Sequence, residues 1–363
     1  MRLTAADIVS AIGNLPKDRM YHYINPDTKE IIVITEVRRP EGPVLIKRFN
    51  PDKGETVNSA KTVSISSEMI WRVANAVLPE APLNLDRILG GSYNTRSALE
   101  SLMAHTPQFY YCYPGRIERK ASTETVRQGH KHIIWKPEKP HNPGVLAEAQ
   151  TKVVVSEIPG KDIFYDAVEI PEGLSVEMDI DIKRRHVQIQ VALIKIGQQL
   201  GFRTWVANND RGIIYNEQRI GEMEGVVQSL NDEKLVQSFE DARGAALLID
   251  CIWFKNGRLM PAVIEIEQST GVTSGLSRMK NLQDHMPPFP TRYVIAAPDD
   301  DRDKVIKEIS KPQFSSLQAK FFPYSAVEEL YYLCERRKIR GVTEEFLDSF
   351  METLTAPGKS LAN

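Results

Sequence analysis

The chain has 363 residues and a hydrophobic content of 42%, which is enough to fill the cores of two domains of ordinary size. Its formal net charge of −2 excludes a global basic field, so a nucleic-acid partner would have to be bound by local basic surfaces. Three scattered cysteines exclude a disulfide framework and a Cys-based zinc site, and they indicate a reducing cytoplasm. No apolar run approaches the ~20 residues that span a bilayer, so we expect no membrane association.

The N-terminal half, residues 1–150, is predicted to be an α+β domain. A capped amphipathic helix at the start is followed by strands over 30–37 and 43–49, helices over 67–77 and 92–103, and an extended segment over 109–113. A short helix, a second helix with a polar cap and a strand-turn wing would make this domain winged-helix-like. We therefore expect residues 1–150 to recognise DNA.

Two groups of residues in this half are candidates for DNA contacts. Asn94, Thr95 and Arg96 begin the second helix, where first-turn side chains of a recognition helix meet base edges. An ordinary N-cap on a packing helix explains the same residues equally well. Basic residues outnumber acids over 115–140, and candidates for phosphate contacts there are Arg116, Arg119 and Lys120. A solvated loop is the alternative for this segment.

The segment 137–144 is rich in proline and histidine and is predicted to link the two halves. In the second half, residues 151–363, the spacing of apolar residues predicts an amphipathic helix over 185–200, which Gly201 ends. A short strand over 204–207 follows, with a polar exit over 208–212. Further on we expect a helix over 274–284 capped by Thr273 or Ser274, a buried strand over 292–297 and a helix over 300–309.

The most informative segment is 245–267, which has the pattern of an apolar hairpin that carries acids. Asn256-Gly257 between two β-rich runs favours a type I′ turn, which places Lys255 opposite Arg258 and Asp250 opposite Val263. Because side chains alternate along a strand, Asp250, Glu265 and Glu267 then share one face, with Asp250 and Glu265 as diagonal neighbours. Pro261 indicates an edge strand or a bulge, and a one-residue bulge would put the acids on opposite faces.

Burial decides what these acids can do. Apolar residues surround Asp250 on both faces of its strand, and a carboxylate in such a place is costly unless it is paired or binds a metal. The alternative is an amphipathic edge hairpin whose acids point into water.

The arrangement Asp-x14-Glu-x-Glu on adjacent strands, followed by a helix, resembles the catalytic core of the PD-(D/E)XK nuclease superfamily. Glu267 stands at the position that usually holds lysine, as in some type II restriction endonucleases. The resemblance implies a restriction-endonuclease-like α/β fold, a mixed sheet flanked by helices. It also implies that Asp250 and Glu265 hold Mg²⁺ with the backbone carbonyl of Ile266, and that Glu267 orients or deprotonates the attacking water.

Residues around the hairpin have possible supporting roles. His186 and Gln190 lie one turn apart on the preceding helix, where related nucleases often place a further metal-approaching acid; a polar helix face is the alternative. On the following helix Ser274, Arg278 and Lys280 are candidates for contacts with the DNA backbone. Lys280 is also a candidate to replace the missing motif lysine, and solvated surface is the default for each.

Together these features predict a Mg²⁺-dependent, site-specific endonuclease of restriction type that cuts double-stranded DNA in the prokaryotic cytoplasm. Cutting both strands of a palindrome would favour a homodimer. A DNA-binding regulator or defence sensor built on an inactive nuclease fold is the main alternative, because the motif lysine is missing. An RNA nuclease is a third possibility.

Overall fold

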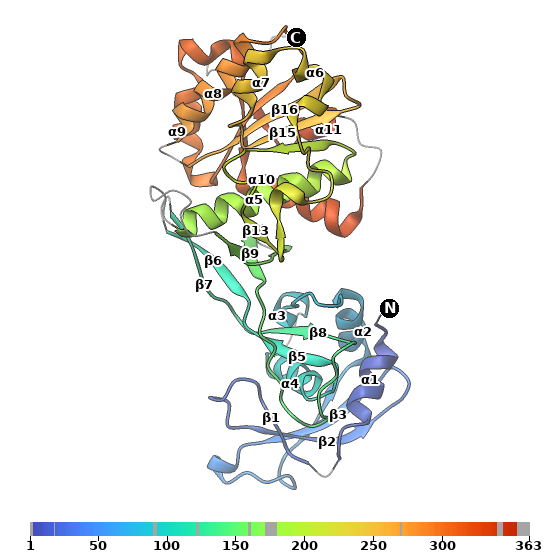
Figure 1. The fold of residues 1–363 in the computed structure, drawn as a ribbon. Coiled ribbons are helices and arrows are strands. Elements are labelled where there is room, and N and C mark those ends of the chain that lie inside the picture. The colour runs from blue at the N-terminus through green and yellow to red at the C-terminus, as the bar shows by residue number, and fades with distance from the viewer. Residues whose placement is uncertain are drawn as a thin grey trace, which may run out of the picture. The chain divides into compact units, whose positions relative to one another are not determined.

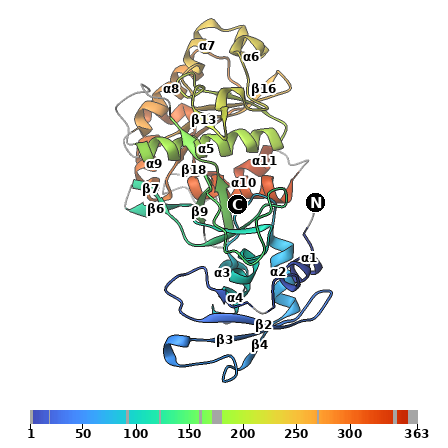
Figure 2. The ribbon, with the colours of Figure 1, turned by 60° about the horizontal axis from the view of Figure 1, so that its bottom comes forward.

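The computed structural model describes residues 3–17, 19–89, 93–120, 123–158, 161–170, 180–268, 271–339 and 344–353 (Figures 1 and 2). The chain forms two compact units: Met1–Arg116 with Arg127–Val155, and Ile117–Val126 with Ser156–Asn363. The predicted linker over 137–144 lies within the first unit. Its backbone is bound there, since His141 N donates to Pro107 O and Gly144 N donates to His105 O, both at 2.8 Å. The linker prediction was therefore wrong.

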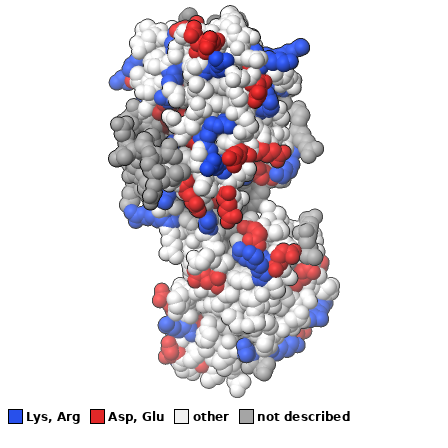
Figure 3. Space-filling view, viewed as in Figure 1, with Lys and Arg blue, Asp and Glu red and all other residues white. Residues whose placement is uncertain are grey.

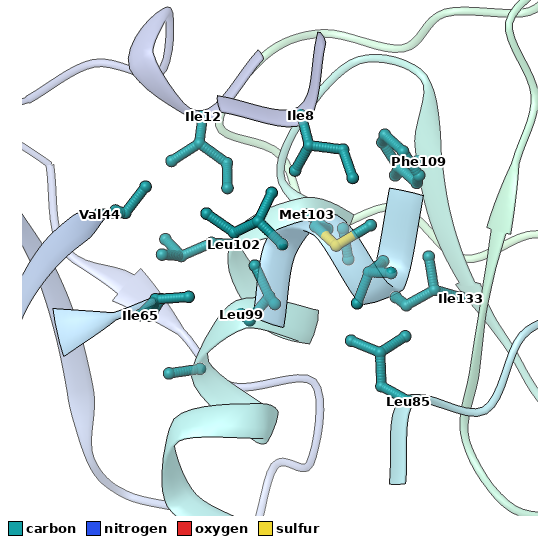
Figure 4. Close-up of a cluster of buried hydrophobic side chains, with 14 of the residues drawn as sticks. Ile8, Ile12, Val44, Ile65, Leu85, Leu99, Leu102, Met103, Phe109 and Ile133 are labelled. Carbon is teal, nitrogen blue, oxygen red and sulfur yellow. The ribbon is translucent and has the colours of Figure 1, made fainter. Parts of the chain in front are cut away.

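The first unit combines a four-stranded antiparallel sheet, in the order β1-β2-β3-β4, with helices and a second pair of strands, β5 and β8. Its elements are α1 (Ala5–Gly13), β1 (Tyr21–His22), β2 (Ile31–Val37), β3 (Val44–Phe49), β4 (Thr62–Ile65), α2 (Ser67–Ala76), α3 (Leu85–Ile88), α4 (Tyr93–Ala104), β5 (Phe109–Cys112) and β8 (His132–Trp135). Side chains from α1, the sheet and α4 meet in one apolar core (Figure 4).

Local sequence explains how the helices of this unit begin. The predicted capped helix at the start of the chain is confirmed as α1, where Thr4 and Asp7 form a capping box. The helix α4 begins at Tyr93, so Asn94 and Thr95 lie in its first turn and not at its cap. The prediction that one of them caps the helix was therefore wrong by two to three residues; boundaries are the least certain part of a predicted helix.

The basic segment 115–140, for which a solvated loop was the alternative prediction, contains β-strands instead. β6 (Gly115–Lys120), β7 (Thr123–Gln128), β9 (Val154–Ile158) and β10 (Lys161–Tyr165) form a sheet in the order β10-β9-β6-β7. β6 runs parallel to β9, with Gly115 beside Val154. A smaller sheet contains β11 (Val168–Glu169), β13 (Ile214–Tyr215) and β14 (Gln218–Arg219).

The second unit is built on a six-stranded mixed sheet in the order β12-β15-β16-β17-β18-β19. Its strands are β12 (Arg203–Val206), β15 (Cys251–Lys255), β16 (Leu259–Ile266), β17 (Arg292–Ala297), β18 (Lys320–Pro323) and β19 (Glu352–Thr353). The helices are α5 (Ile180–Gln199), α6 (Lys234–Gln237), α7 (Glu240–Ala246), α8 (Val272–Asp284), α9 (Arg302–Ile309), α10 (Tyr324–Tyr332) and α11 (Glu344–Asp348). The predicted order of helix, strand, hairpin, helix, strand and helix is confirmed, as is the mixed α/β class.

Helices cover both faces of this sheet (Figure 1). On one face Ile252 and Val263 pack with apolar residues of α7 and α8. On the other face the Trp253 indole donates a hydrogen bond of 3.2 Å to Leu193 O of α5. Because side chains alternate, Asp250, Glu265 and Glu267 belong to the face that α8 covers.

Among the described residues, no helix combines the length and the apolar character that a bilayer crossing demands.

Candidate active site

The hairpin of β15 and β16 brings the three acids to one end of the sheet. The observed register pairs Cys251 with Ile264 and Ile252 with Val263, so Asp250 is next in line with Glu265. The predicted pairing of Asp250 with Val263 was therefore wrong by two residues. A shift of two leaves each side chain on its original face, so the predicted common face of the acids is confirmed.

The two-residue shift has two separate causes. The turn contains three residues, because Lys255 pairs with Leu259 and not with Arg258, although Asn256 and Gly257 both have the positive φ expected of them. A bulge then adds the second shift, since Phe254 stands opposite two residues of β16, one of them Pro261. A proline has no N–H to donate at this point. β16 is an internal strand of the sheet and not an edge.

The three carboxylates form a compact buried cluster. Each of Asp250, Glu265 and Glu267 offers an oxygen within 4.8 Å of the others. Asp250 directly precedes β15, and its Oδ2 accepts a hydrogen bond of 2.8 Å from Ile266 N, which ties the start of one strand to the end of the other. The alternative of an amphipathic edge hairpin whose acids point into water is excluded, because all three residues are buried.

Arg278 supplies the positive charge inside this cluster. Its Nε and Nη2 donate to the two oxygens of Glu265 at 2.9 and 2.8 Å, and Nη2 also donates to Glu267 Oε1 at 2.8 Å. A guanidinium presents this fork of donors in a fixed plane, which suits a bidentate carboxylate. The structure thus places Arg278 among the acids, and the prediction that it contacts the DNA backbone needs this correction.

Two glycines allow α8 to come this close to the acids. A Cβ on Gly275 would lie 2.7 Å from Glu267 Oε1 and 3.1 Å from Glu265 Cβ, and a Cβ on Gly271 would overlap the Glu267 carboxylate. Gly271 is also the N-cap of α8 and makes no side-chain cap. The predicted cap by Thr273 or Ser274 was wrong; the Thr273 hydroxyl instead donates to Glu308 at 2.6 Å.

The helix α5 brings further polar groups to Asp250. Gln190 Nε2 donates to the backbone oxygen of Asp250 at 2.8 Å, and His186 Nε2 lies 3.8 Å from Asp250 Oδ1. Both residues were predicted as accessory positions, and the structure brings both to the site.

Two residues of the site, Asp210 and Lys183, were not predicted from the sequence. Asp210 lies with its Oδ2 3.4 Å from His186 Nε2, and its other oxygen binds the Lys183 ammonium. Asp210 had been assigned to the polar exit of a strand. The structure brings Asp210 to the site because Val206 ends β12 and pairs with Cys251 of β15, so the exit of β12 lies beside Asp250.

Burial sets the acidity of the carboxylates. Complete burial, strengthened by the charge of Asp250, raises the pKa of Glu265 well above its ordinary value despite the bonds from Arg278. Burial and Asp250 likewise raise the pKa of Glu267 to about 7. Protein donors therefore compensate the negative charge of this cluster only in part.

The groups on the α5 side behave differently. Burial favours neutral His186, but the carboxylates of Asp250 and Asp210 outweigh it and raise the pKa of the imidazole. Burial also opposes ionisation of Asp210, yet His186 and Lys183 together hold its pKa below the ordinary range. The imidazole is thus stabilised in its charged form between two carboxylates.

The other residues predicted to contact DNA lie apart from this cluster in the sequence and make contacts of their own. Asn94 is exposed, whereas the Arg96 guanidinium donates to Leu89 O at 2.8 Å and pairs with Asp86 at 3.1 Å. Arg116 bonds the His130 ring at 2.7 Å. Arg119 and Lys120 are on β6, but their side chains lie outside the described residues.

On α8, Ser274 is exposed in the first turn, and Lys280 pairs with Asp284 one turn further along the same helix. The Lys280 ammonium is therefore paired with Asp284 and not with any of the three acids. This pairing does not support the prediction that Lys280 replaces the motif lysine. On the face shown in Figure 3, Lys and Arg are interspersed with Asp and Glu, in keeping with the small net charge.

Comparison with known proteins gives one full-length relationship. Residues 169–354 match the family model of the C-terminal domain of the type II restriction enzyme NmeDI. The chain is 54% identical to the type II restriction enzyme NmeDI of Neisseria meningitidis serogroup C over 354 residues, which cover 97% of this chain and 98% of the relative. No solved structure gives a significant match.

The buried acidic hairpin and these matches define the class of the protein: it is a type II restriction endonuclease. Within this class the chain belongs to the NmeDI family. The predicted restriction endonuclease activity is confirmed, and the inactive regulator is not favoured.

Proposed function

We propose that the enzyme cuts double-stranded DNA at specific sites with Mg²⁺ as its cofactor, and that the second unit is a PD-(D/E)XK catalytic domain. The observation that carries this proposal is the convergence of Asp250, Glu265 and Glu267 in one buried cluster. Buried carboxylates in excess of cations need a counter-charge, and a hard divalent cation with oxygen ligands supplies it.

The donor set fits Mg²⁺. Asp250 and Glu265 provide carboxylate oxygens, and we assign a third ligand to the backbone carbonyl of Ile266. The Arg278 guanidinium bound by two of the acids shows that the cluster holds positive charge. A bound Mg²⁺ would lower the pKa of a coordinated water and stabilise charge on the scissile phosphate.

The chain's own residues hold this site in shape. The Ile266 amide and the Gln190 side chain fix Asp250, while Arg278 joins Glu265 to Glu267. We assign to Glu267 the orientation or deprotonation of the attacking water, because its carboxylate lies beside both metal-binding acids.

We further propose that residues 1–150 read the target sequence through Asn94, Thr95 and Arg96. Contacts with phosphates are assigned to Arg116, Arg119, Lys120, Ser274 and Lys280, and a twofold homodimer would match a palindromic target. Arg96→Ala in the full-length enzyme should weaken binding at one base pair by about 1–3 kcal/mol if Arg96 contacts guanine. Affinities for single-base variants of the site measure this; equal losses on every variant would show that Arg96 only supports its neighbours.

Incubation of the purified enzyme with plasmid and phage DNA, with Mg²⁺ or with EDTA, tests the function directly. We expect discrete fragments with Mg²⁺ and intact DNA with EDTA. Bound but uncut DNA under all metal conditions would favour a regulator, and degradation of RNA beside intact DNA would favour an RNA nuclease.

A further inference from the structure

The first unit contains a cavity of about 720 Å³ to which the proposed function assigns no role. It lies between β1 with the segment that follows it, the turn at residues 51–52, the end of β5 and the segment 146–148. All residues that line it belong to the first unit. The volume is within the range of about 300–1,000 Å³ that is typical of pockets for small organic molecules, so a nucleotide would fit.

The wall of this cavity is aromatic. Tyr23, Tyr111 and Tyr113 line it. Tyr23 is 6% exposed, whereas Tyr111 and Tyr113 are half-buried and meet edge to face with ring centroids 6.0 Å apart. Nucleobases stack on aromatic side chains, since every base has a π-face. The cavity therefore offers the surface that a planar base needs.

The charged residues at the rim decide between a base and a phosphate as the ligand. Asp52 and Glu148 are exposed acids there, and Lys29 is an exposed cation that donates to Pro26 O at 2.9 Å. His22, also at the rim, adds charge only when it is protonated. Two carboxylates beside one ammonium disfavour an anion. Carboxylates instead accept hydrogen bonds from amino groups, as they do from N4 of cytosine.

Glu148 is held in place for such a contact. Tyr111 N donates to Ala147 O at 3.0 Å, and Ala149 N donates to Tyr111 O at 2.8 Å, so the backbone on both sides of Glu148 is fixed beside β5. The Tyr111 hydroxyl donates to Glu148 Oε2 at 3.2 Å, which leaves Oε1 to accept from a ligand. A site that is formed in advance loses little free energy to reorganisation on binding.

We propose that this cavity binds a nucleobase with an exocyclic amino group that has been turned out of the DNA duplex. Inside the duplex the amino group is used in base pairing and the base is stacked on its neighbours, so a base reaches an enclosed pocket only when it is extrahelical. The proposal rests on the proposed function in that the first unit meets the target DNA. Glu148 would recognise the amino group, and Tyr111 and Tyr113 would stack on the ring.

Fluorescence anisotropy of short labelled duplexes tests this, with the full-length enzyme in EDTA so that nothing is cut. The duplexes share one sequence and are either fully paired, or carry one unpaired cytosine, or carry one unpaired thymine, a pyrimidine of similar size that has no amino group. We expect the thymine duplex to bind about fivefold more tightly than the paired one through stacking. The cytosine duplex should bind about tenfold more tightly again, through a hydrogen bond to a charged group.

Two variants separate stacking from recognition of the amino group. Tyr113→Ala should weaken both bulged duplexes about fivefold and leave the paired duplex unchanged. Tyr110→Ala, at the neighbouring tyrosine of β5 that does not line the cavity, is its matched control. Glu148→Gln should abolish the preference for cytosine over thymine, whereas Glu138→Gln, at an exposed position of the same unit, should keep it.

Circular dichroism first shows that each variant is folded, and Tyr113→Phe, which keeps the ring, should bind as the wild type does. Equal affinity of the wild type for the three duplexes would overturn the proposal, as would a cytosine preference that Glu148→Gln leaves intact. Free dCMP that binds as tightly as the cytosine duplex would overturn the duplex as the source of the base. Because cleavage of plasmid DNA with Mg²⁺ is measured separately, an enzyme that cuts but ignores the unpaired base would refute this proposal and retain the proposed function.

Discussion

Two neighbouring residues of α5, Arg185 and His186, reach two buried charged clusters of opposite character. Arg185 and Glu328 are 1% and 0% exposed, and the Arg185 Nη1 donates to Glu328 Oε1 at 2.6 Å. The Tyr165 hydroxyl donates to the same oxygen at 3.0 Å, and the Ser156 hydroxyl to the other at 2.7 Å. One acid here meets one cation, and each carboxylate oxygen has a donor.

The cluster reached by His186 is unbalanced. It contains four acids, Asp210, Asp250, Glu265 and Glu267, and the cationic side chains that bind them are Lys183, Arg278 and, when it is protonated, His186. A balanced buried pair is a structural element. Buried acids in excess of cations either take up protons, as the raised pKa values of Glu265 and Glu267 indicate, or bind a cation from solution. The comparison therefore separates the charges that hold the fold from those to which we assign the chemistry.

The largest expected effect comes from removing a metal-binding acid. Asp250→Ala or Glu265→Ala should reduce cleavage at least about 100-fold, since the charge on the transition state loses its main stabilisation. Binding of target DNA in a gel-shift assay should survive, because the proposed role of these side chains is to hold a metal and not to contact the DNA groove. Normal cutting by either variant would remove the acid from the catalytic machinery.

Glu267→Lys tests the unusual motif position. A second cation beside Arg278, in a pocket built around a carboxylate, should lower the cleavage rate by about 100-fold or more if Glu267 acts on the water. The thermal unfolding temperature checks that the fold is kept. Glu240→Lys, at an exposed position of α7, is the matched control and should cut normally. Wild-type rates for Glu267→Lys would move the role to another residue.

Glu328→Ala tests the balanced cluster. It leaves Arg185 buried without its carboxylate, which should lower the free energy of unfolding by about 3–5 kcal/mol. Urea denaturation measures the loss, and exposed Glu68→Ala is the control. A loss below about 1 kcal/mol would show that the pair adds little to stability and that the contrast between the clusters is wrong.

A smaller effect, and one that depends on pH, is expected at the buried pair of Glu100 and Lys131 in the first unit. Burial outweighs the attraction of Lys131 at 2.5 Å and raises the pKa of Glu100 to about 7 from 4.5. Between these pH values the unfolded state binds fewer protons, so stability should fall as pH rises, by on the order of 3 kcal/mol.

Glu100→Gln should flatten this part of the pH profile, measured by urea denaturation between pH 4 and pH 8, roughly the range over which the group titrates. The exposed Glu68→Gln is the matched control and should keep the wild-type slope. Parallel profiles for Glu100→Gln and the wild type would mean that Glu100 is already ionised at low pH.

The common face of the acids was predictable because side chains alternate along a strand, which is a local property. Glu265 and Glu267 always share a face, and Asp250 joins them whenever the register of the two strands differs from the predicted one by an even number of residues. The register itself was not predictable, since it depends on a bulge at Pro261 that the sequence only permits. Asp210 was missed because its place beside Asp250 follows from the pairing of β12 with β15, which is a long-range contact. Arg278 was misplaced because a sequence does not show that Gly271 and Gly275 let α8 approach the acids so closely.

The bulge opposite Phe254 and the three-residue turn together decide on which face of the hairpin the two glutamates lie. The extra residue in the turn would by itself direct Glu265 and Glu267 away from Asp250, and the extra residue at Pro261 directs them back. An insertion or deletion of one residue in this hairpin would therefore separate the three acids without replacing any of them, whereas a compensating pair of changes would keep them together. Over evolution, the lengths of the turn and of the bulge should change together or not at all.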